Sequence, residues 1–232
     1  MVKRGGDEMK YRHEIKHCIT ISDYYSIMSR LKHIIARDNN AGDGGEYRIR
    51  SLYFDNLYDK ILLEKQLGIN NRDKFRIRYY NDNLSFIKLE KKSKVNGLCL
   101  KVAESISKEE CEKLIRGDIE FLRESSKKLF NELYIKMKNQ LLKPKTIVDY
   151  TREAYIYKAG NVRITFDKKI RTGIWNTDFL NQDIVTKSII SNDYMVLEVK
   201  WDEYLPEIIQ DCVQQGRLSS SVSKYALCRM YD

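Results

Sequence analysis

The stretch Lys74-Phe75-Arg76-Ile77-Arg78-Tyr79 decides the fold class, because charged and apolar residues alternate along it. Successive side chains of a β-strand point to opposite faces of the sheet, so the pattern predicts a strand with one cationic and one apolar face. For one such strand taken alone, the commonest arrangement is a half-buried strand whose charged face lies in water. The other segments of the sequence indicate whether the cationic face points to solvent or into the protein.

Four further segments repeat this design. Their charged or polar faces carry Arg12, Glu14 and Lys16; Lys88, Glu90 and Lys92; Arg163, Thr165 and Asp167; and Glu198 and Lys200. A solvated face usually mixes Ser, Thr and Gln with both charges, whereas these faces favour Arg and Lys. Arginine suits phosphate, since its planar fork donates two hydrogen bonds and stays charged when partly buried.

The apolar faces of these strands can pack outward beneath amphipathic helices, in which case the cationic faces converge inside. A closed barrel has room for them only when its interior holds a charged ligand and water. We therefore expect an α+β fold, in which an antiparallel barrel with helices packed outside forms a polar tunnel. The ligand that this tunnel predicts is a polyphosphate or a nucleoside triphosphate.

Composition fits an anionic ligand. The 232 residues include 42 Lys and Arg against 33 Asp and Glu, a net charge of +9, which suits phosphate, nucleic acid or an anionic membrane surface. No Pro-rich or Ser-rich linker divides the chain, so we expect one domain over residues 11–232 after a tail at 1–10. No apolar run is long enough to span a bilayer, and a soluble, cytoplasmic protein is expected.

Cysteine and histidine usage excludes several classes of site. The five cysteines are odd in number and scattered, which argues against a disulfide framework or a zinc site and favours a reducing compartment. His13, His17 and His33 have no partner cluster elsewhere in the sequence. A histidine-ligated metal or a Ser-His-Asp nucleophile therefore has little support.

Helix signals separate the strands. Asp38–Glu46 is rich in Asn, Asp and Gly and is expected to be a loop. The expected helices are one capped by Ser22 that carries Ile27, Leu31, Ile34 and Ile35; Asn56 to Gly68; a capping box of Ser107 and Glu110 closed by Gly117; Asp118 to Gln140; one from Pro206 to Gly216; and Ser223 to Tyr231.

Seven short motifs give the chain a family resemblance. They are Arg12-x-Glu14-x-Lys16, Ser51-Leu52-Tyr53-Phe54-Asp55-Asn56, Lys74 to Tyr79, Leu89-Glu90-Lys91-Lys92, Arg163-Ile164-Thr165-Phe166-Asp167, Leu197-Glu198-Val199-Lys200 and Ser223-Lys224-Tyr225. In order and spacing, from about Tyr11 to Tyr225, the sequence resembles the triphosphate tunnel metalloenzymes, also called CYTH-like. Within that superfamily it resembles the vacuolar transporter chaperone (VTC) domain, the polyphosphate polymerase branch.

The resemblance implies a barrel of about eight antiparallel strands and a set of site residues. Phosphate-binding residues of the reaction would be Lys16, Arg76, Arg78, Lys92 and Arg163. Further substrate contacts would come from Lys101, Arg152, Lys200 and Lys224, the last on a helix that closes one end. Glu198, assisted by Glu14 or Glu90, would bind Mn²⁺ or Mg²⁺. Two alternatives stay open: Glu198 as the ion-pair partner of a cation, and Glu90 as a counter-ion for the lysines.

One departure indicates the direction of the chemistry. Hydrolytic relatives open with Glu-x-Glu-x-Lys, and here Arg12 replaces the first glutamate. Losing a carboxylate and gaining a cation favours transfer of the γ-phosphoryl group of ATP to a growing inorganic polyphosphate chain. The sensing domain and membrane helices of the eukaryotic polymerases have no counterpart in this sequence. A peripheral membrane partner is compatible with it.

Two other functions remain as alternatives. A tripolyphosphatase or nucleoside triphosphatase of the same fold would need a carboxylate such as Glu14 to activate water. A noncatalytic nucleic-acid-binding module would need aromatic and basic side chains on one exposed face. Because Tyr53, Phe75, Tyr79 and Phe166 are expected on the face opposite the charges, nucleic acid is not an expected partner.

Overall fold

A strongly curled antiparallel sheet dominates the computed structural model, which describes residues 10–39, 41, 44–214 and 222–231. Its eight long strands lie in the order β1-β10-β8-β7-β3-β4-β5-β6. Their bounds are β1 His13–Thr20, β3 Glu46–Asp55, β4 Arg72–Tyr80, β5 Asn83–Val95, β6 Leu98–Ile106, β7 Lys143–Tyr157, β8 Val162–Thr172 and β10 Tyr194–Trp201. Two short strands, β2 (Ala36–Arg37) and β9 (Lys187–Ser188), pair with β7 and β8.

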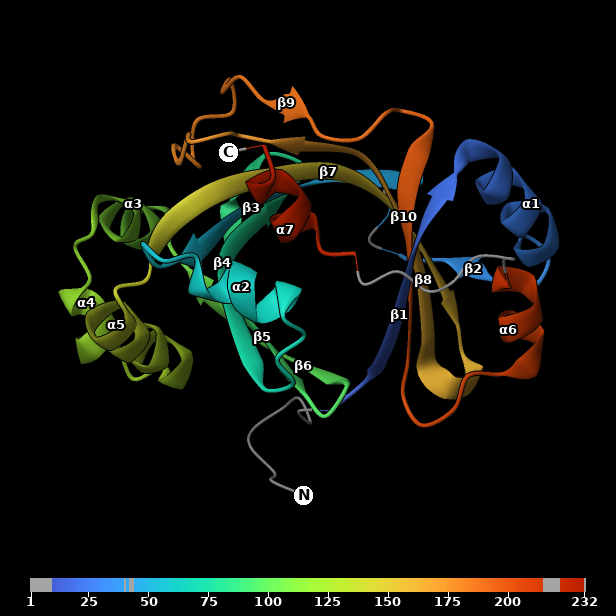
Figure 1. The fold of residues 1–232 in the computed structure, drawn as a ribbon, viewed down its shortest axis with the longest axis horizontal. Coiled ribbons are helices and arrows are strands. Elements are labelled where there is room, and N and C mark those ends of the chain that lie inside the picture. Colours follow the sequence, from blue (N-terminus) through green and yellow to red (C-terminus); the bar gives the residue numbers. More distant parts are fainter. Residues whose placement is uncertain (1–9, 40, 42–43, 215–221, 232) are drawn as a thin grey trace.

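The sheet curls until its two edge strands approach each other (Figure 1). In the described part of the chain, β1 and β6 are joined by one bridge just before β1, in which Arg12 and Cys99 exchange two backbone hydrogen bonds of 2.9 Å. The predicted α+β fold with about eight antiparallel strands is confirmed. Its closure is partial, because the ladder between the edge strands does not continue past this bridge.

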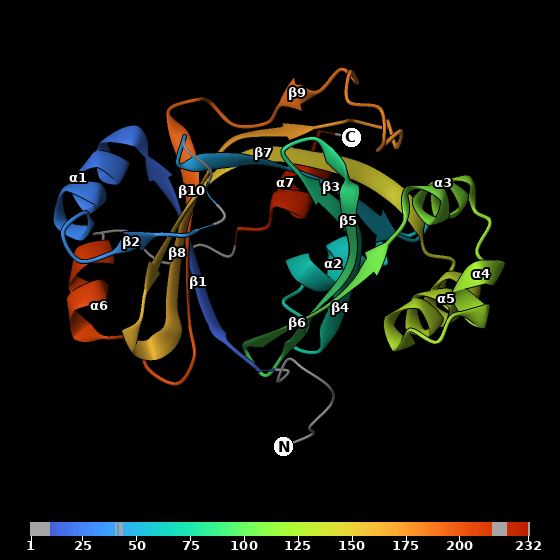
Figure 2. The same cartoon turned by 180° about the vertical axis from the view of Figure 1, so that it is seen from behind.

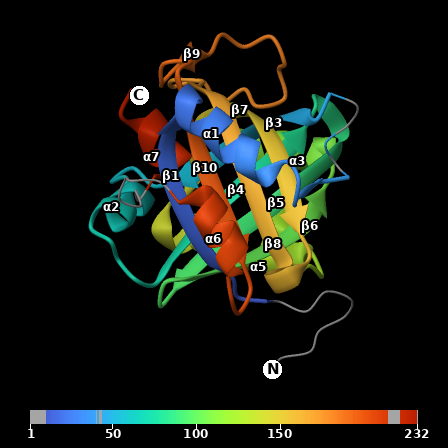
Figure 3. The same ribbon diagram turned by 90° about the vertical axis from the view of Figure 1, so that its right-hand side faces the viewer.

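Most helices cover the outside of the sheet in two groups. The helices are α1 (Ile21–Leu31), α2 (Lys60–Gln66), α3 (Lys108–Arg116), α4 (Glu120–Glu124), α5 (Lys128–Gln140), α6 (Glu207–Val213) and α7 (Lys224–Arg229), with a 3₁₀ turn at Ala159–Asn161. The pair α2 and α7 lies beside the concave side of the sheet (Figure 1). Figure 3 shows α1 and α6 over β1, β10 and β8, and Figure 2 shows α3, α4 and α5 at the opposite end. Each group covers its own apolar core, and the predicted outward packing of the apolar strand faces is confirmed.

Helix boundaries follow side-chain caps. The predicted capping box at α3 is confirmed: Ser107 N–H donates to Glu110 Oε2 at 2.8 Å, and Glu110 N–H donates to Ser107 Oγ at 3.1 Å. The predicted Ser22 cap is wrong, because Thr20 and Asp23 form the capping box of α1. That helix ends at Leu31, before Ile34 and Ile35.

Two other helix predictions need correction. The single helix predicted from Asp118 to Gln140 is two helices, α4 and α5, because the backbone is extended at Ser125. The segment Asn56 to Gly68 is helical only over Lys60–Gln66. Residues 1–9 of the tail predicted at 1–10, the Gly216 helix stop and part of the Asp38–Glu46 loop lie outside the described residues. Lys10, the last residue of that tail, pairs with Asp202 at 2.8 Å.

Strands β6 and β7 carry no clear alternation of charge, and β3 carries one only at its start, where Glu46, Arg48 and Arg50 alternate with Tyr47 and Ile49. In the rest of β3 and in β7 both faces are largely buried, so apolar and polar residues do not segregate by parity. Within the described residues, no helix combines the length and apolarity needed to cross a bilayer.

Candidate phosphate-binding cavity

The concave side of the sheet encloses a cavity of about 800 Å³. Among the described residues, thirteen Lys or Arg side chains and one acidic side chain, Glu198, line it. The basic lining consists of Lys10, Arg12, Lys16, Lys74, Arg76, Arg78, Lys88, Lys92, Lys101, Arg152, Arg163, Lys200 and Lys224. The structure thus brings all nine basic residues predicted for the site into one cavity.

Strand β4 contributes the two central arginines. Phe75, Ile77 and Tyr79 are buried in the outer core, and alternation therefore turns Arg76 and Arg78 inward. Arg76 donates from Nε and Nη2 to Glu90 Oε2 at 2.8 and 2.6 Å, and from Nη1 to the Tyr53 hydroxyl at 2.7 Å.

Arg78 is fixed mainly by neutral groups. Its Nε donates to Ser51 Oγ at 2.9 Å and its Nη2 to the Tyr150 hydroxyl at 3.0 Å, while Glu90 lies 3.8 Å from Nη1. Hydroxyl partners hold the guanidinium in place without cancelling its charge. Arg78 is therefore oriented in advance to bind an anion.

Glu90 is a counter-ion at the base of these arginines. It is 1% exposed, and its second oxygen lies 3.4 Å from Lys101 Nζ. Burial alone would raise the pKa of Glu90, but Arg76, Arg78 and Lys101 hold it well below its ordinary value. Of the two roles considered for Glu90, these contacts favour the counter-ion over the metal ligand.

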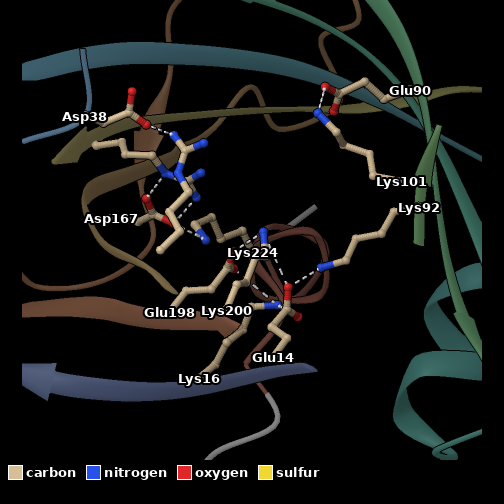
Figure 4. A network of polar contacts seen from close by, with 12 residues as sticks. Glu14, Lys16, Asp38, Glu90, Lys92, Lys101, Asp167, Glu198, Lys200 and Lys224 are labelled. Atoms are coloured by element: carbon tan, nitrogen blue, oxygen red, sulfur yellow. Dashed lines mark hydrogen bonds and ion pairs between the residues drawn. The ribbon is translucent and has the colours of Figure 1, made fainter. Parts of the chain in front are cut away.

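Glu14 and Glu198 form a second network with three lysines (Figure 4). Lys16 Nζ lies 2.5 Å from Glu14 and 3.3 Å from Glu198, and Lys200 Nζ lies 2.5 Å from Glu198 and 3.6 Å from Glu14. Lys92 Nζ contacts Glu14 at 2.6 Å. Burial opposes ionisation of both carboxylates, yet the surrounding lysines keep the pKa of Glu14 and of Glu198 far below the ordinary value.

A third group surrounds Asp167, which is fully buried. Arg152 binds it through two hydrogen bonds of 2.6 and 2.7 Å, and Lys224 at the start of α7 forms an ion pair with it. Lys224 also lies 5.0 Å from the centre of the Tyr150 ring. The helix predicted to close one end thus delivers a buried lysine to the cavity.

Arg163 reaches the cavity from β8. It pairs with Asp38 at 2.7 Å and donates to the Tyr47 hydroxyl at 3.0 Å. At the bridge between the edge strands, Arg12 pairs with Asp202 at 3.0 Å. The residue that replaces a glutamate in the opening motif therefore adds a cation to the cavity lining.

Sequence reasoning missed the tyrosines. Tyr47, Tyr53, Tyr80 and Tyr150 line the cavity, and the prediction that Tyr53 lies on the face opposite the charges is wrong. Tyr53 is opposite Arg76 in the β3–β4 register, so their side chains share a face. Ser51 and Tyr53 are two residues apart in β3 and therefore point to the same face of the sheet. A polar Ser51 on that face was the sequence signal that Tyr53 could face the charges. Burial raises the pKa of Tyr53, but Arg76 and Arg78 lower it below its ordinary value.

Four basic residues line the cavity although they were not predicted as site residues: Lys10, Arg12, Lys74 and Lys88. Lys74 and Lys88 occupy the inward parity of β4 and β5. The alternation that identified Arg76 and Lys92 applies equally to them.

The arrangement of the carboxylates decides which of them could hold a metal ion. Within the described ranges, no three His, Cys, Asp or Glu side chains gather as a potential metal cage. Glu90 is engaged with Arg76 and Lys101, apart from Glu14 and Glu198 (Figure 4). Mg²⁺ in phosphoryl-transfer sites is often held by one or two carboxylates together with substrate phosphates and waters. Both oxygens of Glu198 pair with lysines, as those of Glu90 pair with cations, but Glu198 also lines the cavity, where substrate phosphates could complete the coordination of a metal.

The fold and the cavity define a class of protein, an eight-stranded tunnel fold with a cationic interior. Comparison with protein families gives a match to the VTC domain over residues 11–231. The chain belongs to the VTC domain family. No curated protein matches the sequence.

Several solved structures are similar to this one at low sequence identity. A candidate adenylate cyclase from Bacillus halodurans has a TM-score of 0.48 and 15% identity, with 82% of this chain and 80% of that chain covered. A conserved hypothetical protein from Pyrococcus furiosus has a TM-score of 0.42 and 14% identity, with 87% and 85% covered. A candidate adenylate cyclase from Vibrio parahaemolyticus has a TM-score of 0.43 and 11% identity, with 86% and 80% covered.

Proposed function

We propose that this protein is a metal-dependent polyphosphate polymerase that transfers the γ-phosphoryl group of ATP to the end of an inorganic polyphosphate chain. The observation that carries the proposal is the excess of basic side chains in an enclosed cavity, with Arg78 held by hydroxyl groups. Membership of the VTC family supports phosphate and ATP as ligands.

In the proposed reaction, a terminal oxygen of the acceptor chain attacks the γ-phosphorus of ATP. The bond from that phosphorus to the β–γ bridging oxygen breaks, and ADP leaves with the electron pair. The acceptor phosphate is its own nucleophile, so no protein base is required. Such a reaction asks the protein for alignment and for neutralisation of charge.

The residues divide these tasks. Arg76 and Arg78 would bind nonbridging oxygens of the transferred group, with Arg163 on a neighbouring phosphate. Lys16, Lys92 and Lys101 would hold the chain as point charges, joined by Arg152, Lys200 and Lys224. A Mn²⁺ or Mg²⁺ ion held by Glu198, with Glu14 as its neighbour, would supply charge stabilisation on the phosphate oxygens.

The hydrolytic alternative is less well supported. A hydrolase needs a carboxylate that can accept a proton from water. Both oxygens of Glu14 contact lysines, which favours its permanent ionisation and makes it a weak base. Nucleic acid is also disfavoured, because Tyr53 and Tyr150 place their rings inside the cavity and not on an exposed sheet face.

Product analysis tests the proposal. The protein is incubated with ATP and Mn²⁺, and phosphate chains are resolved by gel electrophoresis and by the ³¹P resonance of mid-chain phosphates. We expect long chains from the native protein, none from Arg76→Ala with Arg78→Ala, and native yields from Arg116→Ala, whose side chain is 77% exposed on α3. ADP and orthophosphate without chains would exclude the polymerase and favour the hydrolase. We further propose that the protein acts in the cytoplasm, where ATP is available.

A further inference from the structure

Lys74 differs from most basic residues of the cavity in its surroundings. Its ammonium group donates to Ser223 Oγ at 3.1 Å and lies 5.6 Å from the centre of the Tyr225 ring. Among the described residues, no carboxylate lies within ion-pair distance of Lys74. By contrast, Lys16, Arg76 and Arg152 each bind a buried carboxylate.

The groups that face Lys74 are nearly all cations. They are Lys16 from β1, Arg72 from β4, Lys92 from β5 and Lys65 from α2, while α7 contributes the Ser223 hydroxyl and the Tyr225 ring. The Tyr225 hydroxyl is directed elsewhere, to Asp55 at 2.5 Å. Lys16 and Lys92 have Glu14 as a counter-ion, but Lys74 has none of its own among the described residues. The repulsion on Lys74 is relieved when an anion enters.

We propose that Lys74 is a phosphate-binding residue at the α7 end of the cavity and that it gains a proton when the anion binds. The proposal rests on the proposed function, since it assigns a contact to the same polyphosphate ligand. It makes β4 the source of three phosphate contacts, Lys74, Arg76 and Arg78, which follow one inward face. Through Ser223 and Tyr225, the same residue connects the bound chain to α7.

Electrostatics supports the proton uptake. Burial, followed by repulsion from Lys16 and Lys92, lowers the pKa of Lys74 to about 7. About half of the molecules then carry a neutral Lys74 at neutral pH. A phosphate group beside the amine favours its charged form, so binding draws a proton from solvent to Nζ. Because only the charged form binds well, the apparent affinity follows the charged fraction.

We expect the affinity for tripolyphosphate to depend on pH through the ionisation of Lys74. Between pH 6 and pH 8 the charged fraction of such a group falls about tenfold, so the affinity for tripolyphosphate should fall by about that factor beyond the ligand's own ionisation. Lys74→Arg keeps a permanent charge and should bind tripolyphosphate at both pH values. Lys74→Met should bind about tenfold more weakly at pH 6 and lose the extra pH dependence.

The experiment is isothermal titration of the full chain with tripolyphosphate, in two buffers of different ionisation enthalpy at pH 7. The difference in heat counts the protons taken up. We expect about half a proton more for the native protein than for Lys74→Met or Lys74→Arg. Lys138→Met, on the exposed face of α5 beside Glu120, should titrate like the native protein.

Each outcome has a separate meaning. Equal proton uptake by the native protein and Lys74→Met would overturn the assignment of Lys74 while leaving the cavity as the binding site. Loss of binding in Lys74→Arg as well as Lys74→Met would also overturn it and would indicate a packing role against α7. Failure of the native protein to bind tripolyphosphate at all would instead contradict the proposed function. Proton uptake without chain synthesis would support Lys74 and contradict the polymerase.

Discussion

Arg78 owes its position to hydroxyl groups, and this geometry sets what a substitution should do. Arg78→Lys keeps the charge but cannot span Ser51 and Tyr150 at the same time, because an ammonium is a point donor on a flexible stem. We expect kcat/KM for ATP to fall by about a hundredfold, which corresponds to about 2.7 kcal/mol.

Steady-state assays of ATP consumption with chain formation measure this effect. Arg116→Lys is the matched control, since Arg116 lies exposed on the outer helix α3, where it pairs with its helix neighbour Glu112 at 3.7 Å. An Arg78→Lys enzyme with native kcat/KM would show that the fixed orientation of the guanidinium has no role in the reaction.

Replacing Glu90 should lower the stability of the ligand-free protein and increase its stabilisation by an anionic ligand. Glu90→Gln removes the charge that compensates Arg76, and breaking a buried ion pair in this way costs about 3 kcal/mol. We expect a lower thermal midpoint for the ligand-free variant and a larger gain on adding tripolyphosphate than in the native protein. Differential scanning fluorimetry with and without tripolyphosphate measures both. A variant whose gain is smaller than the native one would identify Glu90 as part of the ligand site and not as a counter-ion.

At the residue scale, the sequence predicted cations better than their partners. The inward parity of Arg76, Lys92 and Glu198 follows from alternation in their own strands. Arg152 meets Asp167 because β7 and β8 are neighbours, and Arg163 meets Asp38 because the loop after β2 lies beside β8. Local sequence does not encode either contact. The neutral partners of Arg78 were missed for the same reason.

At the scale of elements, one residue at the end of β3 holds the start of α2 and the helix α7 in place. Asp55 is fully buried and accepts hydrogen bonds from the backbone N–H groups of Ile61 and Leu62 at 2.9 and 3.1 Å, and from the Tyr225 hydroxyl. Its side chain therefore caps the start of α2 and anchors α7 together.

We expect Asp55→Ala to lower the free energy of unfolding by about 3 kcal/mol or more, since it leaves several buried donors without acceptors. Ser107→Ala, which removes the exposed cap of α3, should cost about 1 kcal/mol. Urea denaturation followed by circular dichroism compares the two. Equal losses for the two variants would contradict the role of Asp55 as a shared anchor.

The elements that the sequence predicted well have a local pattern. Five strands alternate between one apolar and one polar face, and α3 begins at a capping box of Ser107 and Glu110. Strand β7 was not predicted because its residues from Thr146 to Tyr150 are buried on both faces, including the polar Asp149 that binds Arg50 at 2.9 Å. The break between α4 and α5 was missed because the apolar spacing continues across Ser125.

For the whole molecule, interior carboxylates with depressed pKa values predict acid sensitivity. Glu14, Glu90 and Glu198 have folded pKa values below their ordinary value of 4.5, so they contribute stability above that pH. As the pH falls below about 4.5 the unfolded chain takes up protons that the folded protein does not. The free energy of unfolding should then fall, by up to about 1.4 kcal/mol per pH unit for each carboxylate.

Urea denaturation at pH values from 6 to 3 measures this loss. Glu90→Gln has one fewer such group and should show a shallower decline, which separates these carboxylates from general acid effects. Stability that rises between pH 5 and pH 3 would contradict the assignment of the three ionised glutamates.

The pairing of β1 with β10 has a consequence for how the protein is made. His13 pairs with Trp201, so the first strand cannot find its neighbour until most of the chain has left the ribosome. At bacterial or eukaryotic translation rates of about 5–20 residues per second, β1 waits roughly ten to forty seconds. During that time Lys16 and the strands that follow expose basic faces to nucleic acids and other polyanions. Newly made chains should therefore depend on chaperones, or on the polyphosphate ligand proposed above, to reach the folded state.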